Sequence, residues 1–194
     1  MSLLKSNNYK NILLALSFFV ITACANQPVN RVSTTPLTAA PSIDVDQYLG
    51  RWYEIARLPN SFEKDCDGVT ADYTWRDDGL IAVTNTCRKG SPSGKIKVAN
   101  GKARLVDKTT NSKLEVSFFG PFWGDYWILD IADDYSISLV GEPSGKYLWI
   151  LAREPKLSDQ EKADVLSKLT AFGYDVTALY FPAQPPVPDN PHPE

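Results

Sequence analysis

The 194-residue sequence has very little histidine and few cysteines. Its single histidine, His192, stands in a proline-rich terminal segment, and neither Cys66 nor Cys87 has a metal-ligand neighbour at CxxC or CxxH spacing. Histidine-dependent nucleophiles and metal sites of histidine or paired cysteines therefore have no candidates in the central part of the chain. A phosphate-binding glycine loop with its lysine is missing as well. We expect a binding protein rather than an enzyme, with no catalytic residue, metal or cofactor.

Long hydrophobic runs are also missing. The longest, residues 12–23, is about half of the roughly 20 residues that a membrane-spanning helix requires. It follows Lys5 and Lys10 and ends on small residues, a pattern typical of a cleaved secretion signal, so we expect residues 1–23 to be removed. Losing these two of the 20 basic residues leaves 18 against 23 acidic ones, a net charge of −5. Nucleic acid is therefore not an expected partner.

Ile21-Thr22-Ala23-Cys24 resembles the bacterial lipobox. In proteins with that motif the leader is cut before the cysteine, which then carries three acyl chains, and two lipid signals already suffice for stable anchoring. Ala25 follows, where retention at the inner membrane usually goes with aspartate. The resemblance implies lipid attachment at Cys24 and an anchored protein at the periplasmic face of the outer membrane of a Gram-negative bacterium.

With Cys24 assigned to lipid, Cys66 and Cys87 remain. An exported compartment is oxidising, and an even number of remaining cysteines favours one disulfide. Closing a loop of this length contributes roughly 3 kcal/mol in the chain-entropy model. We predict a structural bridge between Cys66 and Cys87.

Composition divides the chain after the leader into three parts. Residues 24–43 are rich in Pro, Thr, Ala and Ser without apolar periodicity, which predicts a flexible tether after the lipidated cysteine. Residues 182–194 carry six prolines, which predicts an extended and largely unpacked tail. Residues 44–181 are then expected to form one folded domain.

Within this domain, short strand signals recur between turn residues. Residues 69–76 alternate apolar and polar side chains, and Asp77-Asp78-Gly79 turns the chain back into residues 80–87. The further predicted strands are residues 52–57, 95–98, 101–107, 113–119, 126–132, 135–141 and 146–153. This pattern predicts an up-and-down barrel or a sandwich of antiparallel strands.

One helix is expected after the last of these strands. Ser158-x-x-Glu161 is a capping box, apolar residues follow at helical spacing, and Gly173 closes the pattern. We predict that this helix packs on the outside of the sheet. Residues 176–181 are expected to form a last short strand that pairs beside the first one.

Three ordered motifs resemble those of the lipocalins, and more closely those of the bacterial outer-membrane lipoprotein branch. The run Gly50-x-Trp52-Tyr53-Glu54-Ile55-Ala56-Arg57 matches the first motif, residues 130–135 fall at the second, and Arg153 matches the third. The resemblance implies an all-β fold, an eight-stranded antiparallel up-and-down β-barrel with one C-terminal α-helix packed outside. It also implies a structural barrel floor of Gly50, Trp52 and Arg153, in which the guanidinium lies over the indole and contributes about 1–2 kcal/mol.

A barrel of eight strands has room for one small ligand. Alternation assigns apolar and aromatic side chains to the inner faces, and they suit an acyl chain, which gains about 0.8 kcal/mol per buried methylene. The expected ligand-binding cavity wall is Val69, Ala71, Tyr73, Trp75, Ile81, Val83, Asn85, Leu105, Val116, Phe118, Tyr126, Ile128, Leu139, Tyr147 and Trp149. Tyrosine hydroxyls, Asn85, or one of Lys95, Lys97 and Arg104 are candidates to meet an anionic head group at the mouth.

The leading hypothesis is an anchored lipocalin that binds, stores or transports a lipid, either a fatty acid or a lysophospholipid, in envelope maintenance. One alternative is a carrier of another hydrophobic metabolite, such as a pigment or a haem-like molecule. Another is a ligand-free envelope scaffold whose own rings fill the barrel and which contacts partners through residues 118–123. A homodimer is compatible with each of them.

Overall fold

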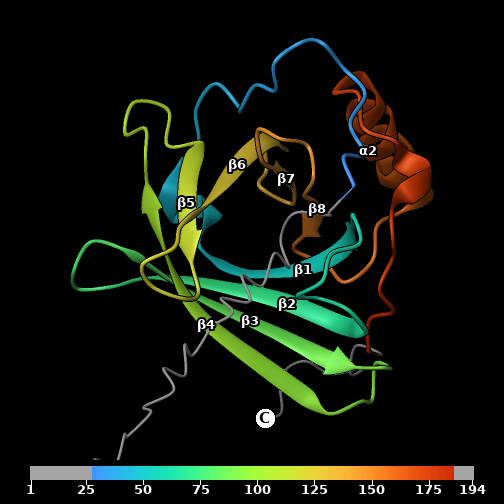
Figure 1. Ribbon diagram of the computed structural model, residues 1–194, viewed down its shortest axis with the longest axis horizontal. Coiled ribbons are helices and arrows are strands. Elements are labelled where there is room, and N and C mark those ends of the chain that lie inside the picture. The colour runs from blue at the N-terminus through green and yellow to red at the C-terminus, as the bar shows by residue number, and fades with distance from the viewer. Residues whose placement is uncertain (1–27, 186–194) are drawn as a thin grey trace, which may run out of the picture.

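A closed β-barrel forms the body of the protein (Figure 1), and the computed structural model describes residues 28–185. Eight antiparallel strands close the barrel in sequence order, and β8 pairs with β1. The strands are β1 (Gly50–Arg57), β2 (Cys66–Trp75), β3 (Ile81–Lys89), β4 (Ile96–Leu105), β5 (Lys113–Ser117), β6 (Gly124–Ile131), β7 (Ile137–Gly141) and β8 (Leu148–Ala152). The helical elements within this range are α1 (Val45–Tyr48), α2 (Asp159–Ala171) and a 3₁₀ turn, η1 (Val176–Ala178). The predicted eight-stranded barrel is confirmed.

The register between strands shows which residues share the inner face. Ala71, Asn85 and Ala99 lie opposite one another on β2, β3 and β4. Since side chains alternate along a strand, Tyr73 and Val83 point to the same side as these residues. The inner face therefore carries the apolar members of the alternating pattern, and the polar members of β2 face outward.

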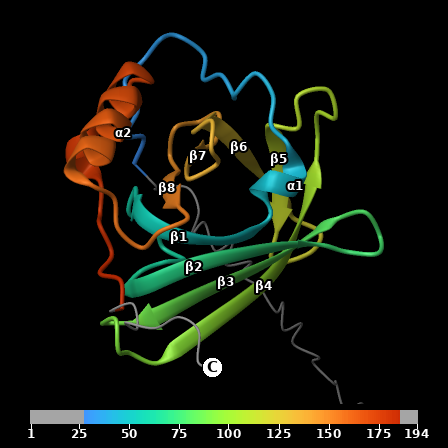
Figure 2. The ribbon, with the colours of Figure 1, turned by 180° about the vertical axis from the view of Figure 1, so that it is seen from behind.

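Hydrophobic side chains form one core inside the barrel and a second one outside it. The inner core includes Trp52, Ala71, Tyr73, Ile81, Val83, Ala103, Leu114, Tyr126, Ile128, Val140 and Leu151. The outer core packs Val165 and Leu169 of α2 against Ala56, Leu129, Leu139, Leu148 and Ile150 of the barrel. Both hydrogen bonds of the predicted capping box, between Ser158 and Glu161, are present at the start of α2. The helix lies beside the barrel in both ribbon views, as predicted (Figures 1 and 2).

The segment before the barrel is packed more closely than its composition predicted. Leu37, Ala40 and Ile43 are buried, and the Ala40 N–H donates to the Ile128 carbonyl at 2.8 Å. Residues 28–43 run from α2 to α1 along the barrel (Figure 2). The prediction of a flexible tether is wrong for residues 28–43, because the few apolar side chains among the small polar ones pack against the barrel.

The segment after α2 also lies against the barrel. The backbone of Tyr180 pairs with that of Arg57 through one isolated β-bridge, so the strand predicted at residues 176–181 is replaced by η1 and this bridge. Further along, the Gly68 N–H donates to the Ala183 carbonyl at 2.8 Å, and the Gln184 side chain donates to the Glu54 carbonyl. The unpacked tail is therefore wrong for residues 182–185.

The two strands predicted at residues 95–98 and 101–107 form one continuous strand, β4. An Asn-Gly pair is typical of a turn, but Asn100 and Gly101 continue the ladder opposite Thr84 and Val83. A Cβ atom on Gly101 would lie 2.8 Å from the Phe118 ring. Glycine is required here for this close approach, not for a turn.

No helix within residues 28–185 is both long and apolar enough to span a membrane.

Candidate functional site

The barrel interior is the candidate site, because most of the predicted cavity wall faces it. Ala71, Tyr73, Ile81, Val83, Leu105, Val116, Phe118, Tyr126, Ile128 and Trp149 belong to the inner core or pack against it. Val69 packs with the Cys66–Cys87 disulfide, and that predicted bridge is present. Asn85 points to the same face, and its Oδ1 is buried without a hydrogen-bond partner. The wall is therefore largely apolar, and the buried acceptor of Asn85 is unused.

Three predicted wall residues lie elsewhere. Leu139 is in the outer core beneath α2, and Ser138 and Val140 point inward instead. Alternation could not set the phase of β7, because this strand is apolar on both faces. Trp75 is 45% exposed at the end of β2 and donates to Asp46 at 2.7 Å, so it lies beyond the interior.

Tyr147 precedes β8 and belongs to an aromatic cluster rather than to the inner core. Its ring stacks on Trp149 with centroids 6.0 Å apart, and the Phe62 ring lies 5.5 Å away. Phe62 comes from the β1–β2 loop and is 54% exposed. These rings mark the open end of the barrel, opposite α1.

The floor of the barrel has the geometry that the resemblance implied. The Arg153 guanidinium carbon lies 3.7 Å from the centre of the Trp52 ring, and Trp52 is fully buried. Arg153 also donates to the carbonyls of Arg51, Gln47 and Leu49 at 2.7, 2.7 and 2.9 Å. Gly50 has φ +92°, a conformation that side chains disfavour, so glycine permits the entry into β1. The arginine thus ties α1, β1 and β8 together.

Three tyrosine side chains lie next to this floor. The Tyr126 hydroxyl lies 2.8 Å from that of Tyr48 and 3.0 Å from that of Tyr73, and Ser138 Oγ donates to Tyr48 over 3.4 Å. Burial raises the pKa of Tyr48 to about 12 and raises the pKa of Tyr73 and of Tyr126. All three hydroxyl groups are therefore protonated and neutral at physiological pH. Sequence reasoning missed Tyr48, because it lies on α1 rather than on a strand.

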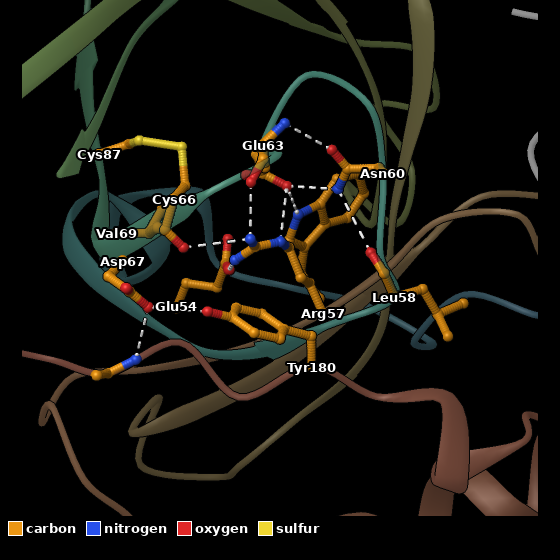
Figure 3. A network of polar contacts seen from close by, with 12 residues as sticks. Glu54, Arg57, Leu58, Asn60, Glu63, Cys66, Asp67, Val69, Cys87 and Tyr180 are labelled. Atoms are coloured by element: carbon orange, nitrogen blue, oxygen red, sulfur yellow. Dashed lines mark hydrogen bonds and ion pairs between the residues drawn. A yellow bond between two sulfur atoms is a disulfide. The ribbon is translucent and has the colours of Figure 1, made fainter. Parts of the chain in front are cut away.

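A charged network occupies the open half, where sequence reasoning placed none (Figure 3). Arg57 pairs with Glu54, both being at least 96% buried, and donates to the Glu63 carbonyl at 2.8 Å. Glu63 in turn accepts from Asn60 and, over 3.1 Å, from the Trp149 indole N–H. Glu54 shares the face of Trp52 by alternation, so that signal was in the sequence. A β-bulge between Glu54 and Ala56 turns Arg57 to the same side.

The network holds two carboxylates close to one guanidinium. Burial raises the pKa of Glu54 well above its usual value, and the negative charge of Glu63 raises it further, against the opposing effect of Arg57. Glu54 therefore retains its proton to a higher pH than an exposed glutamate. The backbone carbonyl of Cys66 also accepts from Arg57, so the network connects the β1–β2 loop to the disulfide (Figure 3).

The three basic residues expected to meet an anionic head group are either paired with an acidic residue or exposed. Arg104 pairs with Glu115 at 2.6 Å and stacks 4.2 Å from the centre of the Trp123 ring. It points away from the interior, because its neighbours Ala103 and Leu105 on β4 face inward. Lys95 and Lys97 are exposed. Cys24 and His192 lie outside the described residues.

Comparisons with known proteins agree with this geometry. A model of the lipocalin-like domain matches residues 43–184. Outer membrane lipoprotein Blc of Escherichia coli K12 is 38% identical over 179 residues, which are 90% of this chain and 96% of that protein. Apolipoprotein D of Mus musculus is 35% identical over 159 residues, 76% of this chain and 80% of that protein.

Solved structures show the same fold. Insecticyanin from the tobacco hornworm Manduca sexta superposes with a TM-score of 0.63 at 20% identity, covering 78% of this chain and 86% of that one. Together, the barrel, the floor and these matches show that the chain belongs to the lipocalin family.

Proposed function

We propose that this chain is an outer-membrane-anchored lipocalin that binds a lipid with one acyl chain, such as a fatty acid or a lysophospholipid, inside its barrel. The observation that carries the proposal is the inner wall of the open half. Phe118 and Trp149 face inward there and yet are only partly buried. Apolar side chains that stay partly exposed on a concave face gain free energy when an acyl chain covers them.

The anchoring part of the proposal rests on the lipobox-like sequence before Cys24 and on the relatives. The Escherichia coli, Citrobacter freundii and Vibrio cholerae relatives are all named outer membrane lipoproteins. An anchored barrel at the periplasmic face would store or carry membrane lipids in envelope maintenance. Radiolabelled palmitate incorporated by the wild type and not by Cys24→Ser tests the attachment, and equal labelling of both would contradict it.

Two neighbouring residues on β4 provide a matched test of binding inside the barrel. Ala99 faces the interior, and Val98 faces outward and is 51% exposed. Ala99→Trp fills the space that an acyl chain would occupy, whereas Val98→Trp adds the same bulk to the outer surface. We expect Ala99→Trp to weaken displacement of a fluorescent fatty acid by hexadecanoic acid by about tenfold or more, equivalent to about 1.4 kcal/mol. Val98→Trp should bind as the wild type does.

A ligand-free scaffold is the second candidate, and one observation favours it. The cavity between the floor tyrosines measures about 10 Å³, room for about one water molecule. The closed half is therefore filled by its own side chains. Absence of saturable fatty-acid binding in the wild type, and of any lipid purified with it, would support the scaffold and overturn the carrier.

A further inference from the structure

Four connections surround the open end of the barrel. In an up-and-down barrel every second connection lies at the same end, and those after β1, β3, β5 and β7 lie at the end opposite α1. We call these connections the open rim, namely residues 58–65, 90–95, 118–123 and 142–147. Among the described aromatic side chains, the two most exposed are on this rim, Phe119 at 81% and Phe122 at 76%.

Aromatic side chains lie on both sides of the mouth. Phe62, which is 54% exposed, is on the β1–β2 connection, and Phe119 and Phe122 are on the β5–β6 connection. These two connections are four strands apart in a barrel of eight, so they face each other across the opening. Next to Phe122, the centre of the Trp123 ring lies 4.2 Å from the Arg104 guanidinium carbon. Exposed phenylalanines beside a tryptophan with a cation are typical of surfaces that contact the membrane–water interface.

A basic segment lies at the same end. Residues 88–97 contain no acidic residue and four basic ones, namely Arg88, Lys89, Lys95 and Lys97, although the chain as a whole has a net charge of −3. Lys95 and Lys97 are exposed, and Lys97 lies opposite Cys87 on the face of β4 that points inward, at the mouth. Positive charge that is concentrated on one edge of an acidic protein favours an anionic partner surface.

The N-terminal part of the described chain also lies at this end. Arg31 packs against the β7–β8 connection, where a Cβ atom on Gly145 would lie 2.6 Å from the Arg31 Cβ. The residues after Arg31 lead away from the rim to α1 at the floor (Figure 2). Cys24 precedes Arg31 by seven residues, and an extended chain covers at most about 3.6 Å per residue, roughly 25 Å in all. A lipid on Cys24 would therefore hold the open rim, rather than the floor, next to the membrane surface.

We propose that the open rim is a docking surface for an anionic phospholipid bilayer. Phe119 and Phe122 enter the leaflet that carries the anchor, and Lys95 and Lys97 pair with lipid phosphates at its surface. The mouth of the barrel then opens toward the acyl chains that it binds, so a lipid enters without crossing water. The orientation rests on the proposed anchor at Cys24, whereas the exposed aromatic and basic side chains of the rim do not depend on it.

A nitroxide label on a single cysteine measures which end of the barrel contacts lipid. With Cys24 acylated and Cys66 bonded to Cys87, an introduced cysteine is the only free thiol. Phe119→Cys places the label on the open rim, and Val106→Cys, at an apolar residue that is 57% exposed, places it at the floor end. In vesicles of phosphatidylethanolamine and phosphatidylglycerol, we expect oxygen dissolved among the acyl chains to relax the label at 119 and an aqueous nickel chelate to relax the label at 106. Equal exposure of both labels to the nickel chelate would overturn the inference.

The lysines of the basic segment test whether the docking surface selects an anionic bilayer. Each basic side chain near an anionic surface strengthens association by about fivefold. We therefore expect Lys95→Gln combined with Lys97→Gln to lower the ratio of docked to free rim, measured with the label at 119, by roughly fivefold or more in the phosphatidylglycerol vesicles. Lys108→Gln, at an exposed position of the floor end, should leave this ratio unchanged. Equal ratios in the two variants would overturn the pairing with lipid phosphates.

Three further results separate the docking surface from the proposed function. Palmitate on Cys24 together with a water-exposed label at 119 would overturn the docking surface and leave the anchor supported. A lipid-exposed label at 119 in protein without palmitate would overturn the anchor and support the docking surface. A label at 119 that is shielded from both oxygen and nickel, and that shows dipolar coupling to a second label, would assign the rim to a dimer of this chain and overturn membrane docking.

Discussion

The two halves of the barrel interior differ in charge and in how completely they are filled. The closed half contains Trp52 under Arg153, neutral tyrosine hydroxyls and fully buried aliphatic side chains. The open half contains the buried pair of Glu54 and Arg57 next to aromatic residues that stay partly exposed. Side chains of the closed half chiefly stabilise the fold, and those of the open half leave surface for a ligand. Substitutions in the two halves should therefore separate stability from binding.

Trp52→Ala should have the largest effect on stability. Truncating a fully buried tryptophan costs about 3–5 kcal/mol, and the lost contact with Arg153 adds about 1–2 kcal/mol. We expect a strongly lowered midpoint in urea unfolding, while the variant that remains folded keeps the ranking of fatty acids. An unchanged urea midpoint together with an altered ranking of fatty acids would place Trp52 in the ligand site. It would contradict the separation of stability and binding between the two halves.

Arg57→Met should have the next largest effect. The variant keeps much of the side-chain volume but leaves Glu54 and Glu63 buried without their guanidinium, which costs about 3–5 kcal/mol. Urea unfolding measures the loss. Arg51→Met is the control, because Arg51 pairs with Asp72 on the surface at 59% side-chain exposure. A similar small change in both variants would mean that the open half is solvated rather than buried.

The disulfide should contribute about 3 kcal/mol by the chain-entropy model. It connects Cys66 and Cys87, which are 21 residues apart, at the open end. We expect the double variant Cys66→Ser, Cys87→Ser to unfold at lower urea concentration and to resemble the wild type measured under reducing conditions. A wild type that is insensitive to reductant would contradict a stabilising role.

Glu54→Gln should change how stability depends on pH. The raised pKa means that the folded chain keeps a proton that the unfolded chain releases near the ordinary value of 4.5. This contribution is complete below that pH and is lost as pH rises toward the folded pKa. The slope for one such group is at most about 1.4 kcal/mol per pH unit. In Glu54→Gln this decline above pH 4.5 should disappear. An identical slope in both proteins would rule out Glu54 as the group.

The fold was largely predictable from sequence, because turn residues, the capping box and the motif around Trp52 agreed with one another. The phase of β7 was not, since Leu139 and Val140 are both apolar and both faces of that strand are covered. The Arg57 side chain points inward because of a β-bulge, and no residue type in the sequence predicts this bulge. Contacts made by isolated apolar residues, such as Leu37, have no local signature either.

The candidate site was predictable in its apolar part and not in its polar part. Alternation identified inward residues such as Val83 and Val116, whereas the hydroxyl chain joins an α1 residue to three strands. Such a chain depends on tertiary proximity. It could be recognised only after the barrel had placed Tyr48 next to Tyr126.

Native mass spectrometry of the protein released from its own membrane tests the central claim most directly. The account predicts that the wild type and Val98→Trp carry one single-chain lipid per protein and that Ala99→Trp carries none. Wild-type protein without lipid, or equal lipid on Ala99→Trp and Val98→Trp, would contradict binding inside the open half of the barrel.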